Sequence, residues 1–138
     1  MVTPNETTHP TRDAWYRVTA YVGGATRNGL LLDVETHRTW VRRIASALAG
    51  LSGGGCTVHA PATGCWRGVT EPSTLVEALV PYSVWRGAHP ARAAFNVVLQ
   101  HFLAATCQDA VLVTAAYLAP NEVTFVTAHD SEGVVAGG

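Results

Sequence analysis

The segment GGGCTVHAPATGCWRGVTEPSTLVEALV (53–80) holds several side chains that could do chemistry within 28 residues. Cys56, His59 and Cys65 have the composition of half of a structural zinc site, but such sites need four converging ligands and no second pair follows. On a strand, Cys56 and His59 point to opposite faces because they are three positions apart. A disulfide between Cys56 and Cys65 or a thiol activated by His59 stays open. The simplest interpretation is small cysteines in a strand and a turn, with no metal and no cofactor.

A carboxylate interrupts the apolar segment TLVEALV (74–80) at Glu77. Burying a lone charge is costly, so Glu77 is either paired or used in a site. Strand alternation places it on the same face as Arg17 and His59. His59 and Glu77 could then act as general acid and base of an isomerase, cyclase or lyase.

Hydrophobic periodicity predicts the elements that would position these side chains. Helical spacing indicates one helix in the segment 35–51, with Gly50 as its expected end. It indicates a second helix over 89–107, with Pro90 near its start. Aromatic and β-branched residues, bounded by turn signals such as Asn28-Gly29, indicate strands. The strands are expected over 14–24, 55–60, 73–82, 109–118 and 121–128, with a turn at PATG (61–64).

This order of elements predicts an α+β domain of ferredoxin-like type, β-α-β-β-α-β, with an extra C-terminal strand and two helices on one face of an antiparallel sheet. Alternate strand positions divide into two sets. The uniformly apolar set, which should face the helices, is Val18, Ala20, Val22, Val58, Val76, Ala78, Val80, Val111, Val113, Val123 and Phe125. The other set mixes polar residues with leucines, and such an open face usually contacts another copy, a peptide or a ligand.

The whole chain has 138 residues, 48% of them hydrophobic and 14% charged, with a formal net charge of −1. These values predict one globular domain over 14–128, between a flexible arm (1–13) and a flexible tail (129–138). Nine basic against ten acidic residues give no electrostatic footprint for nucleic acid. No apolar run reaches the roughly 18 residues of a membrane span, and the N-terminus lacks a signal-peptide core. We therefore expect a cytoplasmic protein that does not bind membranes.

Four short motifs follow one another along the chain: YVGGATRNG (21–29), GCTV (55–58), GCWRGVTEPS (64–73) and CQDAVLV (107–113). Over roughly residues 15–117 this order resembles small bacterial and phage proteins of ferredoxin-like fold. Some of these are anti-Thoeris sponges, which sequester cyclic ADP-ribose-type signal nucleotides in oligomers without cleaving them. The resemblance implies a nucleotide ligand, a homo-oligomer and ligand-binding roles for Trp66, Arg67, Glu71 and Gln108.

Three classes of function follow from these observations. The first is a non-enzymatic, oligomeric binding protein for a small polar or anionic ligand, in which arginines contact the ligand and aromatic rings stack on it. The second is an interaction module that uses the open sheet face, and the third is the acid–base enzyme of His59 and Glu77. The ligand-binding residues expected for the first class are Arg17, Tyr21, His59, Trp66, Arg67, Glu71, Glu77 and Gln108.

Overall fold

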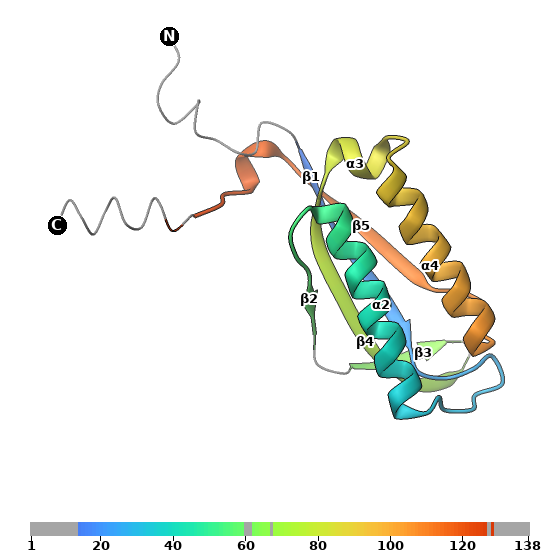
Figure 1. Cartoon of the computed structure of the whole chain (residues 1–138). Helices are drawn as coiled ribbons and strands as arrows, with labels where there is room; N and C mark the ends of the chain where they lie inside the picture. Colours follow the sequence, from blue (N-terminus) through green and yellow to red (C-terminus); the bar gives the residue numbers. More distant parts are fainter. Residues whose placement is uncertain (1–13, 60–61, 67, 127, 129–138) are drawn as a thin grey trace, which may run out of the picture.

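The computed structural model describes residues 14–59, 62–66, 68–126 and 128 (Figure 1). The predicted arm (1–13) and tail (129–138) lie outside these residues. The described residues form an α+β structure with three α-helices, one short 3-10 helix and an open five-stranded antiparallel sheet. In chain order the elements are β1 (Trp15–Gly23), α2 (Val34–Ser52), β2 (Thr57–Val58), β3 (Ala62–Trp66), β4 (Val69–Pro81), α3 (Tyr82–Arg86), α4 (Pro90–Thr106), β5 (Leu112–Leu118) and η1 (Pro120–Glu122).

The strands of the sheet follow the order β2-β4-β1-β5, and β3 also pairs with β4. β1 lies between β4 and β5 and is antiparallel to both. β2 pairs with β4 at Glu77 and Val76, whereas β3 pairs with it at 69–73. Both short strands therefore share the edge of β4 that faces away from β1, and β5 forms the opposite edge of the sheet.

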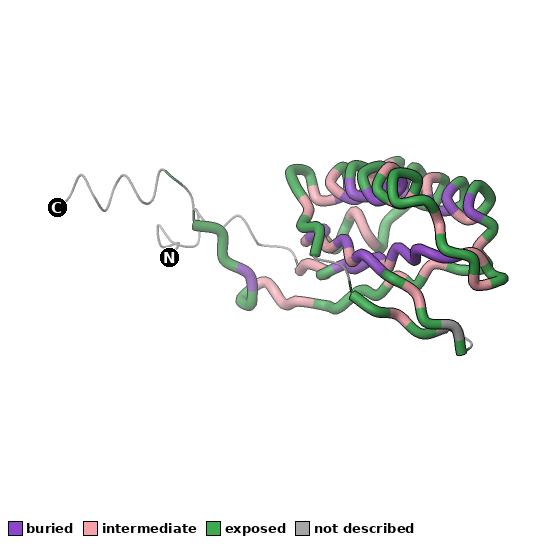
Figure 2. Tube along the Cα trace, turned by 90° about the horizontal axis from the view of Figure 1, so that it is seen from below, coloured by how far each residue is buried: buried purple, intermediate pink, exposed green. Residues whose placement is uncertain are grey.

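The hydrophobic core is formed by residues of β1 and β4 together with residues of α2 and α4, and Figure 2 shows where the chain is buried. The predicted inward set of the two central strands is confirmed, since each of these residues is buried in that core. Trp40 and Phe102 meet edge to face, with ring centroids 5.7 Å apart, and join the two helices. The core residues of the sheet and helices are Val18, Ala20, Val22, Val76, Ala78, Val80, Trp40, Val41, Ile44, Ala45, Leu48, Leu51, Phe95, Leu99 and Phe102.

Two members of that inward set, Val58 and Phe125, are exposed. Val58 lies opposite the inward Val76 and so shares its face as predicted, whereas the prediction was wrong for Phe125. Val58 lies in the two-residue edge strand β2, where the helices do not cover it. Phe125 lies outside every strand and packs its ring against Trp15 at 5.4 Å. Strand parity alone therefore identified the inward face of the central strands but not the residues that the helices cover.

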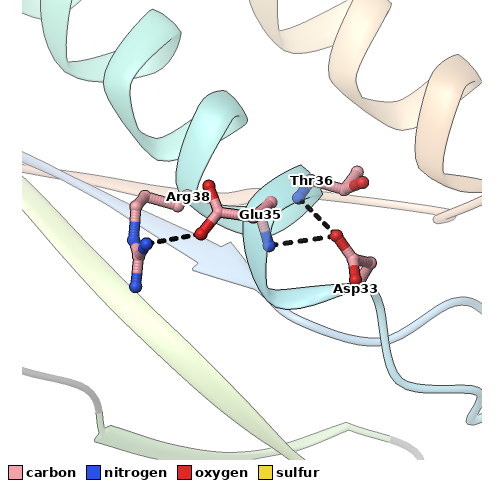
Figure 3. Close-up of polar contacts among 4 residues, drawn as sticks. All are labelled: Asp33, Glu35, Thr36 and Arg38. Carbon is pink, nitrogen blue, oxygen red and sulfur yellow. Dashed lines mark hydrogen bonds and ion pairs between the residues drawn. The ribbon is translucent and has the colours of Figure 1, made fainter.

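The start of α2 shows why its sequence folds as a helix (Figure 3). Asp33 Oδ2 accepts hydrogen bonds from the backbone N–H groups of Glu35 and Thr36, at 3.1 and 3.2 Å. These bonds satisfy donors that have no partner within the first helical turn. Glu35 and Arg38 form an ion pair at 2.6 Å on the exposed side. The expected end at Gly50 was wrong, because the helix continues to Ser52.

The end of α2 is set by Gly53, whose φ of 80° terminates the helix in the left-handed conformation. Leu51 is buried in the core, which explains why the helix runs past Gly50. The second predicted helix is confirmed as α4, with Pro90 in its first turn and the His89 ring accepting a hydrogen bond from the Ala91 N–H.

Two further predictions about strands were wrong. Residues 62–64, part of the expected PATG turn, belong to β3, and the reversal comes later at Gly68 with a φ of 79°. The expected strand at 121–128 does not form over 123–126. There η1 redirects the chain after β5, and Glu122 Oε1 accepts a hydrogen bond from the Ala119 N–H, which stabilises the turn.

None of the helices in the described part of the chain is both long enough and apolar enough to cross a membrane.

Candidate functional site

A pocket of about 380 Å³ lies at the end of the sheet where β1 ends. Its walls come from three parts of the chain: β1 with the loop that follows it, the β3–β4 hairpin, and the segment between α4 and β5. The side chains that carry its chemistry are Tyr21, Arg27, Cys65, Glu71, Gln108 and Asp109.

Gly23, the last residue of β1, lies among the pocket residues and is closely approached by two side chains. A Cβ at this position would lie 2.6 Å from Glu71 Oε1 and 3.2 Å from Gln108 Oε1. Only a glycine lets both oxygens come this near the backbone. Gln108 Nε2 donates a hydrogen bond to the Gly23 carbonyl at 3.0 Å, which orients the amide so that its oxygen can accept another. Two acceptor oxygens therefore converge over Gly23.

The environment of Glu71 favours its protonated form more than water does. Burial raises the pKa of this carboxyl, while a hydrogen bond from the Ala25 backbone and the nearby His37 ring oppose the rise. His37 Nε2 lies 3.1 Å from the Val22 carbonyl oxygen, so this nitrogen carries the proton that is donated. Glu71 is thus a carboxyl held in a partly desolvated site rather than an ordinary surface acid.

Arg27 joins the loop after β1 to the segment before β5. Its backbone N–H donates to the Cys107 carbonyl at 2.9 Å, its Nε donates to the same oxygen at 3.3 Å, and its Nε lies 3.7 Å from Asp109 Oδ1. Within the loop, Thr26 Oγ1 accepts from the N–H groups of Asn28 and Leu30. The predicted turn at Asn28-Gly29 is confirmed, with Gly29 at a φ of 82°. These bonds fix two walls of the pocket to each other.

A second polar cluster, centred on Glu77, lies on the open face of the sheet. Thr19 Oγ1 donates to Glu77 Oε1 at 3.1 Å, and Arg17 Nε lies 4.0 Å from the same oxygen. His59 Nε2 is 3.7 Å from Glu77 Oε2. The expectation that Arg17, His59 and Glu77 share one face is therefore confirmed. Their side chains are 54, 45 and 32% exposed, so these ion pairs contribute little stability.

The eight residues expected at a ligand site fall into separate groups. Tyr21, Glu71 and Gln108 line the pocket. Arg17, His59 and Glu77 form the second cluster, which is not among the residues that line it. Arg67 lies outside the described residues, and the Trp66 side chain is not described either.

Among the pocket residues that sequence reasoning did not assign to a ligand site are Gly23, Arg27 and Asp109. The pair Gly23-Gly24 was a usable signal, because glycine at the end of a strand often marks a close approach to the backbone. Arg27 and Asp109 gave no comparable signal, since they are brought together only by the folded chain.

The three cysteines are free thiols. Cys56 Sγ lies 3.3 Å from the Ala45 carbonyl on the helix side, opposite to His59, as strand parity predicted. Burial raises the pKa of Cys56, which disfavours a nucleophilic thiolate. Cys65 lies at the pocket and is exposed. Among the residues that the structure describes, no three His, Cys, Asp or Glu side chains are grouped so that they could hold a metal ion.

No protein-family model, no curated protein and no solved structure matches this chain.

Proposed function

We propose that the chain is a non-enzymatic binding protein that holds a small polar ligand in the pocket beside Gly23. The convergence of Glu71 Oε1 and Gln108 Oε1 over Gly23 is the observation that carries this proposal. Two acceptors that meet in a partly desolvated pocket favour a ligand group with two hydrogen-bond donors, such as an amine, an amide or neighbouring hydroxyls. The pocket volume of about 380 Å³ suits a small molecule.

The charges around the pocket combine two carboxyls with one guanidinium, which supports a polar ligand that has both hydrogen-bond donors and an anionic part. Glu71 and Asp109 both line the pocket, and the guanidinium of Arg27 lies near Asp109. A nucleotide-type signal molecule, the ligand class implied by the resemblance, has an amino group and ribose hydroxyls that could donate to the two acceptors. In this proposal its phosphate groups lie toward Arg27, and the protein sequesters the molecule unchanged, as a sponge in an anti-defence role.

The proposal also includes a ferredoxin-like arrangement of the fold and a cytoplasmic location. Counting β2 and β3 as one interrupted strand makes the strand order 2-3-1-4, which supports a ferredoxin-like arrangement. The core shared by the sheet with both α2 and α4 supports two helices on one face. Three free thiols are typical of a reducing compartment, which supports the cytoplasm.

Native mass spectrometry of the freshly purified chain tests the proposal, together with calorimetric titration of cyclic ADP-ribose as a nucleotide probe. We expect an added mass that is released on denaturation, or heat of binding from the probe. Gln108→Ala should weaken binding about tenfold, the effect of losing one good hydrogen bond. Gln100→Ala is the matched control, because Gln100 is an exposed glutamine of α4 outside the pocket. A chain with neither retained mass nor probe binding, or equal affinity in both variants, contradicts the proposal.

An acid–base enzyme is a second candidate, favoured by the 3.7 Å approach of His59 Nε2 to Glu77 Oε2 on an accessible face. It predicts that a bound ligand is chemically changed with time by the wild-type chain but not by a His59→Ala/Glu77→Gln double variant. Recovery of an unchanged ligand from both chains would exclude this function and leave the binding protein.

A further inference from the structure

β5 (Leu112–Leu118) forms one edge of the sheet, and its sequence LVTAAYL contains no charged residue, no proline and no glycine. Edge strands carry unpaired backbone N–H and C=O groups, and stable monomers usually protect them with lysines, prolines, bulges or very short strands. The opposite edge has such protection, since β2 has only two residues and a separate strand, β3, continues that edge. β5 has none of these features, so its sequence favours pairing with another strand.

The side chains of β5 are also unusually accessible for apolar residues. Leu112 is 58% exposed on one face of the strand and Tyr117 is 55% exposed on the other. Thr114, Ala115 and Ala116 between them are exposed as well. The Tyr117 ring is already held in place, with its centroid 5.8 Å from that of Tyr16 and 6.3 Å from that of Tyr82. An ordered aromatic ring at the surface loses little conformational entropy when a partner covers it.

We propose that β5 pairs antiparallel with β5 of a second copy of this chain, about a twofold axis that passes through Ala115. A twofold interface brings the same surface of both copies together, so the strand must be complementary to itself. Centring the pair on Ala115 places Leu112 opposite Leu118 and Val113 opposite Tyr117, each pair occurring twice. Opposite residues in an antiparallel pair project to the same face, so these pairs make direct contact.

The uncharged composition of β5 favours a second copy of the chain as its partner. With no charge in the strand, self-pairing places no like charges opposite each other, and every cross-strand pair consists of apolar or small residues. The backbone groups of β5 that do not bond to β1 form a new ladder, and the two sheets continue as one across the axis. Leu112 also lines the pocket, so Leu118 of the second copy would lie at the pocket rim.

This interface does not depend on the proposed function, and the two can fail separately because one is measured by mass and the other by ligand binding. The test is sedimentation velocity on the full chain at about 10 to 100 µM. We expect a dimer of about 29 kDa, twice 14.6 kDa. Ala115→Lys should weaken dimerisation at least tenfold, since the two lysines would face each other at a Cβ separation of about 5 Å.

Thr63→Lys is the matched control, because Thr63 is an exposed residue of the opposite edge strand β3. A dimer that persists in Thr63→Lys and becomes a monomer in Ala115→Lys supports the interface. A monomeric wild-type chain would overturn it, as would a dimer that Ala115→Lys leaves intact. The second result, combined with loss of the dimer when residues 123–138 are removed, would indicate exchange of the C-terminal segment instead.

Hydrogen exchange of the wild-type dimer keeps the proposal testable if Ala115→Lys does not fold. The backbone amides of 112–118 that do not bond to β1 should exchange more slowly as the chain concentration rises and dimer accumulates. Exchange in this segment that is independent of concentration, while the mass shows a dimer, would place the interface elsewhere and overturn the proposal.

Discussion

Replacing Gly23 with alanine would separate the role of this residue in the proposed ligand binding from its role in folding. The added Cβ would lie 2.6 Å from Glu71 Oε1 and 3.1 Å from its Cδ. Ordinary van der Waals contact begins at 3.4 Å, so the carboxylate must withdraw by about 0.8 Å, the difference between 3.4 and 2.6 Å. The carboxylate is the far end of a flexible side chain, so we expect it to move while the strand stays in place.

The expected change in the free energy of unfolding is therefore small. Alanine in place of a strand glycine gains about 0.5 to 1 kcal/mol from reduced freedom of the unfolded chain. Displacing Glu71 weakens its hydrogen bond with the Ala25 backbone, which costs about 1 kcal/mol. The two terms nearly cancel, so the free energy of unfolding of Gly23→Ala should stay within about 1 kcal/mol of the wild-type value. Ligand binding should fall about tenfold or more.

Gly24→Ala is the contrasting variant. Its Cβ would lie 2.9 Å from Pro72 Cγ and 3.0 Å from the Pro72 carbonyl oxygen. A proline ring and a backbone carbonyl cannot swing aside, and this carbonyl already accepts a hydrogen bond from the Gly24 N–H at 2.8 Å. Overpacking of this kind should lower the free energy of unfolding by about 1 to 3 kcal/mol.

Urea unfolding and carbon NMR of the Glu71 carboxyl would measure both effects. In Gly23→Ala the Glu71 signal should move and its pKa should fall toward the ordinary value as the group becomes more hydrated, with the unfolding midpoint nearly unchanged. A Gly23→Ala chain that loses as much stability as Gly24→Ala, while the Glu71 signal keeps its shift and pKa, would refute the argument that Glu71 moves aside for the added Cβ.

Two further substitutions test the charge and backbone arguments. Burial raises the pKa of Glu71 in the folded chain, so the stability linked to this carboxyl is complete below its unfolded pKa of about 4.3 and is lost as pH rises through the raised value. Urea unfolding from pH 4 to 7 should therefore show a shallower loss of stability for Glu71→Gln than for the wild type, and parallel profiles would contradict the raised pKa. Cys107 ends α4 with a φ of 52°, in the left-handed region that glycine adopts without steric cost. Cys107→Gly should raise the free energy of unfolding by up to about 1 kcal/mol, and a lower urea midpoint would contradict that expectation.

The helices could be predicted from the sequence because their signals are local. The helical spacing of Trp40, Ile44 and Leu48 marks the buried side of α2, and the same spacing of Phe95, Leu99 and Phe102 marks that of α4. The central strands were also predictable, because the inward residues in the middle of β1 and β4 are apolar.

Elements at the margins of the sheet could not be predicted in the same way. β3 has the sequence ATGCW, in which small residues and a glycine give little strand signal, and it forms because β4 offers a partner. The segment after Glu122 shows the converse, since Val123 and Phe125 alternate with threonine and valine but no strand forms there. A strand needs a neighbour with free backbone groups, and periodicity along one segment cannot reveal whether that neighbour exists.

For the same reason, the sequence predicted the cluster around Glu77 but not the pocket. Arg17, His59 and Glu77 could be placed together because each follows from the parity of a strand, and the register then brings Glu77 opposite Thr19. The pocket depends instead on a hydrogen bond between Gln108 and Gly23, which are 85 residues apart, and on side chains from loops. A glycine at the end of a strand shows that something approaches the backbone, but only the fold shows that the approaching groups are two acceptors. The proposed ligand site rests on this approach of two oxygens to the backbone of Gly23, which the fold creates and no single segment of the sequence predicts.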